Sequence, residues 1–230
     1  MIDYPANLAR LQQQIAAACK DAGRPVDSVQ LLAVSKGQPI AAIEAVAALG
    51  QRAFGENYVQ EGVVKCQALA GLGLEWHFIG RLQSNKAALV AEHFDVCQSV
   101  DRLRLVEALA KGRADAQPPL QVLIQLNVDD EAGKGGAAPA EMPELAAAIV
   151  AQPKLQLRGL MAIPRPDPDP QVRAQAFASL AALYAQLKRD YPQVDTLSMG
   201  MSDDYAQAIH HGSTLVRIGT ALFGPRAWPA

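Results

Sequence analysis

A lysine at the end of an apolar run is the first residue of this chain that could do chemistry. Residues 29–37 read VQLLAVSKG, and the stretch 31–34 has the continuous apolar character of a strand buried on both faces. Lys36 follows directly. Removing water from around its ammonium group favours the neutral amine, which can attack a carbonyl. The alternative is that Lys36 only extends to solvent at the rim of the fold, and this segment alone favours that alternative. The rest of the sequence favours the reactive amine.

Two turns near the C-terminus have the composition of a phosphate site. Gly200-Met201-Ser202 follows one expected strand, and Gly219-Thr220 follows the next. Glycine permits close backbone approach, serine and threonine add hydroxyl groups, and helix starts present N–H donors, so Ser202, Gly219 and Thr220 are candidate phosphate ligands. Ordinary turn chemistry is the alternative. The occurrence of both turns after the last two expected strands favours phosphate.

Arg217 lies two residues before Gly219 and therefore shares its face of the strand. A cation inside a fold needs a partner, and a network of carboxylates is the structural alternative to a ligand. An amine, a phosphate site and an arginine together indicate pyridoxal 5′-phosphate (PLP), bound as an imine to Lys36 with Arg217 at the pyridine nitrogen. Arginine only donates hydrogen bonds, so that nitrogen stays unprotonated and the ring is a poor electron sink, which argues against transamination.

The elements that must position these residues alternate between strand and helix. An amphipathic helix is expected over residues 4–20, and eight strands are expected at 31–34, 52–57, 75–80, 95–100, 120–127, 155–163, 196–200 and 215–219. Alternation predicts parallel strands joined by right-handed crossovers. Eight units fit a single (β/α)₈ TIM-type barrel over 1–230 with an extra N-terminal helix, and an open doubly wound sheet is the competitor.

In such a barrel the carboxyl ends of all the strands meet on one face. Besides Lys36 and the C-terminal turns, this convergence brings in Asn57, Asn127 and Met161. Ser84 and Asp101 are expected to cap the helices that follow the third and fourth strands.

The composition of the chain disfavours several classes of binding partner and several cellular compartments. Half of the residues are hydrophobic and the net charge is −2, which does not favour nucleic acid or an anionic membrane as a partner. Three widely spaced cysteines form no disulfide framework or metal motif and are expected to be buried free thiols in a reducing cytoplasm. The sequence contains no evident signal peptide and no apolar run of membrane-spanning length. His77 is more typical of a satisfied core or rim histidine than of a base.

Several long motifs make the chain resemble the pyridoxal phosphate homeostasis proteins, which are related to the N-terminal barrel of alanine racemase. The motifs are LLAVSK at 31–36, FGENYVQE at 54–61, WHFIGRLQSNK at 76–86, SVDR at 99–102, RGLMAI at 158–163, LSMGMSDDYAQAI at 197–209 and GSTLVRIGTALFG at 212–224. The resemblance implies PLP on Lys36, phosphate at Ser202, Gly219 and Thr220, and Arg217 at the ring nitrogen, with Asn57 beside the ring.

One departure from the family pattern follows the lysine. Gly37 and Gln38 stand where relatives often have a threonine and another polar or basic residue, which argues against a second-lysine relay but not against the imine. Lys134 is a candidate secondary cofactor contact, with surface charge as the alternative.

The resemblance implies a carrier or buffer of PLP that influences amino- and keto-acid balance, without established catalysis. Apo-PLP enzymes are expected as transient partners. A monomer is expected because no second domain is evident, and the cysteines indicate the cytoplasm. Racemases of this type take an opposing tyrosine base from a second domain, whereas only seven residues follow Phe223. The rival hypotheses are a PLP-dependent amino-acid racemase-like enzyme, a lysine-imine aldolase acting on a sugar phosphate, and a structural or partner-binding barrel.

Overall fold

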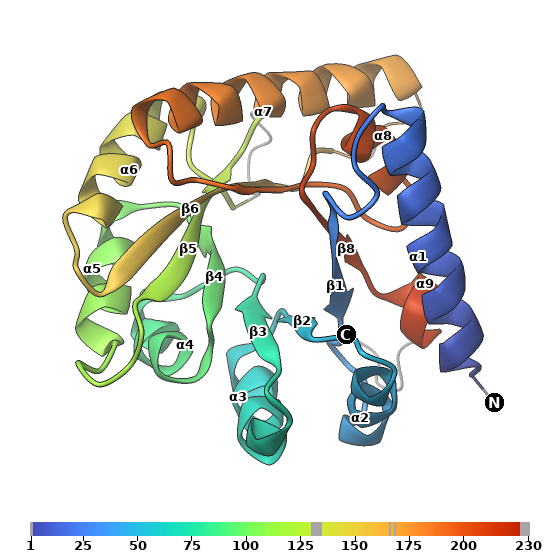
Figure 1. The fold of residues 1–230 in the computed structure, drawn as a ribbon. Helices are drawn as coiled ribbons and strands as arrows, with labels where there is room; N and C mark the ends of the chain where they lie inside the picture. The colour runs from blue at the N-terminus through green and yellow to red at the C-terminus, as the bar shows by residue number, and fades with distance from the viewer. Residues whose placement is uncertain (1, 130–134, 166, 168, 226–230) are drawn as a thin grey trace.

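Eight parallel strands close into a barrel in the order in which they occur in the sequence (Figure 1). The computed structural model describes residues 2–129, 135–165, 167 and 169–225. The closure is made by β1, which pairs with both β2 and β8. The strands are β1 Gln30–Val34, β2 Ala53–Glu56, β3 Glu75–Phe78, β4 Val96–Val100, β5 Leu120–Leu126, β6 Leu155–Ala162, β7 Thr196–Ser198 and β8 Leu215–Ile218. The predicted barrel is confirmed, and the open sheet is excluded.

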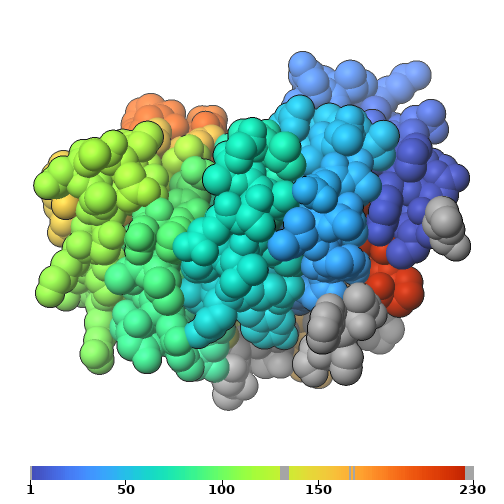
Figure 2. Space-filling view, turned by 90° about the horizontal axis from the view of Figure 1, so that it is seen from below, coloured from blue at the N-terminus to red at the C-terminus, as the bar shows by residue number. Residues whose placement is uncertain are grey.

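Helices cover the outside of the barrel, and Figure 2 shows those of the first half of the chain side by side, from light blue to green. They are α1 Tyr4–Asp21, α2 Ile40–Ala48, α3 Val59–Ala68, α4 Ala87–His93, α5 Leu103–Gly112, α6 Met142–Val150, α7 Pro170–Asp190, α8 Tyr205–His210 and α9 Thr220–Phe223, with short 3₁₀ helices η1 Ala70–Leu72, η2 Ser84–Lys86 and η3 Pro139–Glu141. The expected extra helix is α1. It buries the predicted stripe of Leu8, Leu11, Ile15 and Cys19, and it runs alongside α8 and α9 (Figure 1).

The interior of the barrel differs from the layer between strands and helices. That outer layer is one continuous apolar core. Inside the barrel lie two smaller apolar clusters, and buried polar side chains accompany them because alternate residues of each strand point inward. The first cluster comprises Leu32, Ala53, Ile79 and Leu215, the second Val96, Leu123 and Met161, and the polar residues include His77, Gln98, Ser198 and Arg217.

Both predicted helix caps are wrong. Ser84 begins the short helix η2, and α4 starts three residues later without a side-chain cap. The helix α5 starts at Leu103, one residue too late for Asp101 to cap it. The Asp101 carboxylate instead accepts hydrogen bonds from Arg102 at 2.5 Å and from the N–H of Gly136 at 3.3 Å.

Cys19, Cys66 and Cys97 are buried free thiols, as expected. Within the described ranges, no group of three or more His, Cys, Asp or Glu side chains is arranged to hold a metal ion. Across the same residues, none of the helices combines the length and the apolar character that a membrane crossing requires.

Candidate functional site

Lys36 lies half-buried in the turn that directly follows β1. The register pairs Val34 with Gly55, and the N–H of Ser35 donates to the Gly55 carbonyl at 2.9 Å. Lys36 therefore lies at the level of Asn57, two residues beyond Gly55. This arrangement brings together the first two predicted site residues at the carboxyl end of the barrel.

A buried ionic network holds the backbone on both sides of Lys36. Lys65, from α3, donates to the carbonyl of Ser35 at 2.7 Å, to Glu56 at 2.8 Å and to Glu61 at 2.6 Å. Glu56 also accepts from the Ser35 hydroxyl at 2.5 Å, and Glu61 accepts from the N–H of Gly37 at 2.6 Å. Burial raises the pKa of Glu56, while the charge and hydrogen bond of Lys65 oppose that shift.

Sequence reasoning missed this network. The signal for half of it was the spacing of four between Glu61 and Lys65 on one helix. Nothing local indicated that Lys65 reaches back to β1.

Asn57 brings an unpaired acceptor to the same rim. Its side-chain oxygen Oδ1 is buried and has no hydrogen-bond partner among the described residues. The loop after β3 passes so close that a Cβ on Gly80 would lie 1.9 Å from the Asn57 carbonyl oxygen. The absence of a side chain at position 80 therefore allows this loop to pack on Asn57.

Arg217 lies buried inside the barrel, and three acceptors hold its guanidinium. Nη1 donates to the carbonyl of Ser198 at 2.9 Å and to its hydroxyl at 2.6 Å, and Nη2 donates to the carbonyl of Ala162 at 2.9 Å. Burial lowers the pKa of Arg217 to about 10, against an opposing effect of Asp204, so the group stays cationic at neutral pH. Met161 precedes Ala162 and packs in the interior against Val96 and Leu123.

The loops after β7 and β8 carry the predicted phosphate ligands. The N–H of Arg217 donates to the Gly200 carbonyl at 3.0 Å, which ties the β7 loop to β8 two residues before Ser202. A Cβ on Gly219 would lie 3.2 Å from the carbonyl oxygen of Val34, so the β8 loop lies beside the end of β1. Ser202 is half-buried and Thr220 is exposed.

The helix α8 follows the β7 loop and begins at Tyr205. The carboxylate of Asp204 does not cap that helix. It accepts from the N–H of Met201 at 2.6 Å and closes the turn before it.

Two further residues were singled out in the sequence, His77 and Lys134. His77 is buried and hydrogen-bonded to Glu75 and Gln98, which confirms a satisfied core histidine. Lys134 lies outside the described residues.

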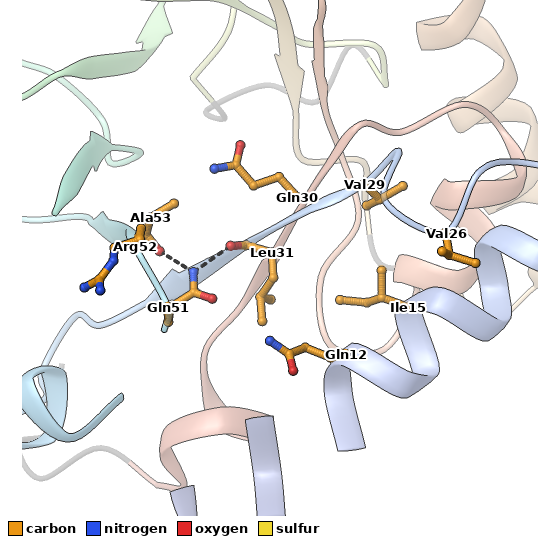
Figure 3. Close-up of a pocket in the computed structure, with 9 residues that line it drawn as sticks. All are labelled: Gln12, Ile15, Val26, Val29, Gln30, Leu31, Gln51, Arg52 and Ala53. Carbon is orange, nitrogen blue, oxygen red and sulfur yellow. Dashed lines mark hydrogen bonds between the residues drawn. The ribbon is translucent and has the colours of Figure 1, made fainter. Parts of the chain in front are cut away.

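A pocket of about 270 Å³ occupies the other end of β1, as Figure 3 shows. Its walls come from α1, the start of β1 and the residues leading into β2, and the Gln51 amide there donates to the carbonyls of Leu31 and Ala53 at 2.8 Å each. Because Gln30 and Leu31 are the first two residues of the strand that Lys36 follows, this pocket is separate from the rim that carries the predicted site.

Comparisons with known proteins identify the family. Residues 6–227 match the family model described as alanine racemase, N-terminal domain. A pyridoxal phosphate homeostasis protein of Escherichia coli K12 is 53% identical over 229 residues, 98% of each chain. One of Pasteurella multocida is 54% identical over 224 residues, 96% of each chain.

Among solved structures, PipY of Synechococcus elongatus PCC7942 with PLP bound has a TM-score of 0.81 and 38% identity, covering 96% of this chain and all of the other. Alanine racemase from Corynebacterium glutamicum has a TM-score of 0.69 at 18% identity, with 95% of this chain and 62% of the racemase covered, a likeness of fold alone. The sequence identities, their coverage and the closed barrel together establish that the chain belongs to the pyridoxal phosphate homeostasis protein family.

Proposed function

We propose that this protein binds PLP at the carboxyl end of its barrel and acts in intracellular PLP homeostasis as a carrier or buffer. The observation that carries the proposal is the common rim of Lys36, Asn57 and the loops after β7 and β8, with Arg217 buried beneath them. The names of the curated relatives and the PLP-bound PipY structure support the choice of ligand.

Lys36 is the residue proposed to hold PLP covalently. Its amine would form a C=N bond with the aldehyde carbon of PLP, and the aldehyde oxygen would leave as water. Bound PLP supplies an electron-withdrawing ring and an anionic phosphate. The network of Lys65, Glu56 and Glu61 orients the backbone from which Lys36 extends.

Arg217 and Asn57 offer hydrogen-bonding groups that match the pyridine ring of PLP. The guanidinium presents only donors, which match an unprotonated pyridine nitrogen. Asn57 Oδ1 is a buried acceptor without a protein partner in the described part of the chain, so a donor on a ligand would relieve its desolvation. Met161 packs below these groups in the interior of the barrel.

The phosphate is assigned to Ser202, Gly219 and Thr220. These residues occupy the loops after the last two strands, where hydroxyl groups and backbone N–H groups can surround an anion. Turnover is not part of the proposal, because racemisation needs a base on each face of the ring and the racemase likeness extends only to the fold. We further propose a single-domain, monomeric, cytoplasmic protein that meets apo-PLP enzymes transiently.

The decisive experiment compares visible spectra after PLP is added to the wild type, Lys36→Ala and the control Lys111→Ala, whose lysine is exposed at the end of α5. We expect a yellow imine band in the wild type and the control, and its loss in Lys36→Ala. Borohydride should bleach the band and leave the cofactor fixed on the peptide that contains Lys36. An unchanged band in Lys36→Ala would refute the assignment.

The racemase alternative makes a different prediction. Wild-type protein loaded with PLP is incubated with single enantiomers of several amino acids, and chiral chromatography follows the opposite enantiomer. We expect no steady multiple turnover. Sustained turnover that is lost in Lys36→Ala would replace the carrier with an enzyme.

A further inference from the structure

A continuous chain of hydrogen bonds crosses the interior of the barrel from one end to the other. It starts at Arg217, whose Nη1 lies 2.6 Å from the Ser198 hydroxyl. That hydroxyl lies 2.7 Å from Gln98 Oε1, and Gln98 Nε2 lies 2.8 Å from His77 Nδ1. The last bond joins His77 Nε2 to Glu75 Oε1 at 2.6 Å.

Arg217 determines which atom donates and which accepts in every hydrogen bond of this series. Because a guanidinium only donates, the Ser198 hydroxyl accepts from it and gives its own proton to Gln98 Oε1. The amide nitrogen of Gln98 then faces Nδ1 of His77, which must accept. A neutral His77 therefore carries its proton on Nε2 and donates to Glu75, and every bond points from the cation to the carboxylate.

Glu75 ends the series of hydrogen bonds on the side opposite Arg217, at the amino-terminal mouth of the barrel. It opens β3, its side chain is 39% exposed, and it lines a cavity of about 40 Å³ at that mouth. The hydrogen bond from His77 lowers the pKa of Glu75, so this end of the chain is anionic at neutral pH. Ser198, Gln98 and His77 thus link two opposite charges on opposite sides of a buried interior.

We propose that Ser198, Gln98, His77 and Glu75 are positioning residues for Arg217. The carboxylate polarises the bonds between it and the arginine, which strengthens the Ser198 oxygen as an acceptor and holds the guanidinium in one orientation. A group at the amino-terminal mouth then affects how firmly the opposite mouth retains a ligand. The identity of that ligand, PLP, rests on the proposed function, whereas the chain of hydrogen bonds does not.

Removing the charge of Glu75 tests whether that carboxylate affects Arg217 through the series of hydrogen bonds. Glu75→Gln keeps an acceptor for His77 but loses the charge, and the matched control Asp115→Asn removes a 93% exposed carboxylate that pairs with Lys154 and does not line this cavity. We expect PLP to dissociate about 3- to 10-fold faster from Glu75→Gln, with a shifted absorption maximum, and no change in the control. Equal rates in wild type and Glu75→Gln would overturn the proposal.

A second pair of variants tests the step next to the arginine. Ser198→Ala removes the relay hydroxyl, whereas Ser99→Ala removes a buried hydroxyl that has no partner in the described part of the chain. Ser198→Thr restores a hydroxyl. We expect faster PLP release only in Ser198→Ala, with recovery in Ser198→Thr, and equal effects in the two alanine variants would contradict a specific role.

A measurement without PLP separates this inference from the proposed function. Nitrogen-15 NMR of the ligand-free protein should find His77 protonated on Nε2 and unprotonated on Nδ1, with that preference weakened in Ser198→Ala. A proton on Nδ1 in the wild type would overturn the direction of the chain even if PLP binds. Failure of the wild type to bind PLP would refute the proposed function and leave the NMR result standing.

Discussion

At the residue scale, the properties of Lys36 depend on neighbours that are distant in sequence. Lys65 and Glu61, from α3, bind the backbone of Ser35 and Gly37, on either side of Lys36, and Glu56 pairs with Lys65 and accepts from the Ser35 hydroxyl. Glu56 and Lys65 are both almost inaccessible to solvent. A buried pair of this kind is costly to break, because removing one partner leaves the other charge without compensation.

Lys65→Met should therefore destabilise the protein by about 3 to 5 kcal/mol, measured by urea unfolding. The matched control is Lys154→Met, which removes a lysine paired with the 93% exposed Asp115 and should cause a far smaller loss. Similar losses in the two variants would contradict the importance of the buried pair.

The same variant has a predictable pH dependence. Lys65 opposes the burial-raised pKa of Glu56, so removing Lys65 raises that pKa further. A carboxyl with a raised folded-state pKa binds its proton more tightly in the folded state, so stability falls as pH rises from the ordinary value of 4.5 through the folded value. The deficit of Lys65→Met relative to wild type should grow across that window. A deficit that does not change with pH would show that Glu56 is not its source.

At the scale of elements, the loops after the strands bring the site residues to one rim. The loop after β3 lies on the backbone of Asn57 because Gly80 has no side chain. The loop after β7 is tied to β8 by the bond from the Arg217 N–H to the Gly200 carbonyl. The site therefore depends on close packing between loops as well as on the strands.

Gly80→Ala should disturb this packing, because the added Cβ would lie 1.9 Å from the Asn57 carbonyl oxygen. We expect a loss of about 1 to 3 kcal/mol in urea unfolding and weaker PLP binding through displacement of Asn57. Gly71→Ala is the control, since a Cβ there meets nothing within 4 Å. Unchanged PLP affinity in Gly80→Ala would show that Asn57 does not contribute.

At the scale of the whole molecule, the closed barrel and its helices bury all three thiols. Burial raises the pKa of Cys97 to about 12 and also raises that of Cys66. Because the thiolate is the reactive form, both thiols should be inert while the barrel is intact.

Labelling with a thiol-reactive disulfide reagent at pH 8 should therefore be very slow in the native protein. In denaturant all three cysteines should react at the rate of a free thiol such as glutathione, which serves as the control. Rapid native labelling of Cys66 or Cys97 would mean that the barrel or its helix layer opens far more readily than its packing indicates.

The sequence by itself determined the eightfold alternation, the place of Lys36 after the first strand, and the shared face of Arg217 and Gly219. These features are local: apolar runs, spacings of two, and turn residues lie within a few positions of one another. The same local signals misplaced the caps at Ser84 and Asp101, because Ser84 opens the short helix η2 and the Asp101 carboxylate accepts from Arg102 and from the N–H of Gly136 instead.

Tertiary structure alone decided that the sheet closes, that Lys65 reaches the backbone beside Lys36, and that Arg217 is linked to Glu75. Closure requires β1 to pair with β8, which begins 185 residues after the start of β1. The contact between Ser198 and Gln98 spans 100 residues of sequence. Such pairs are set by strand register and by the inward direction of alternate side chains, and neither property can be seen in a single segment of the chain.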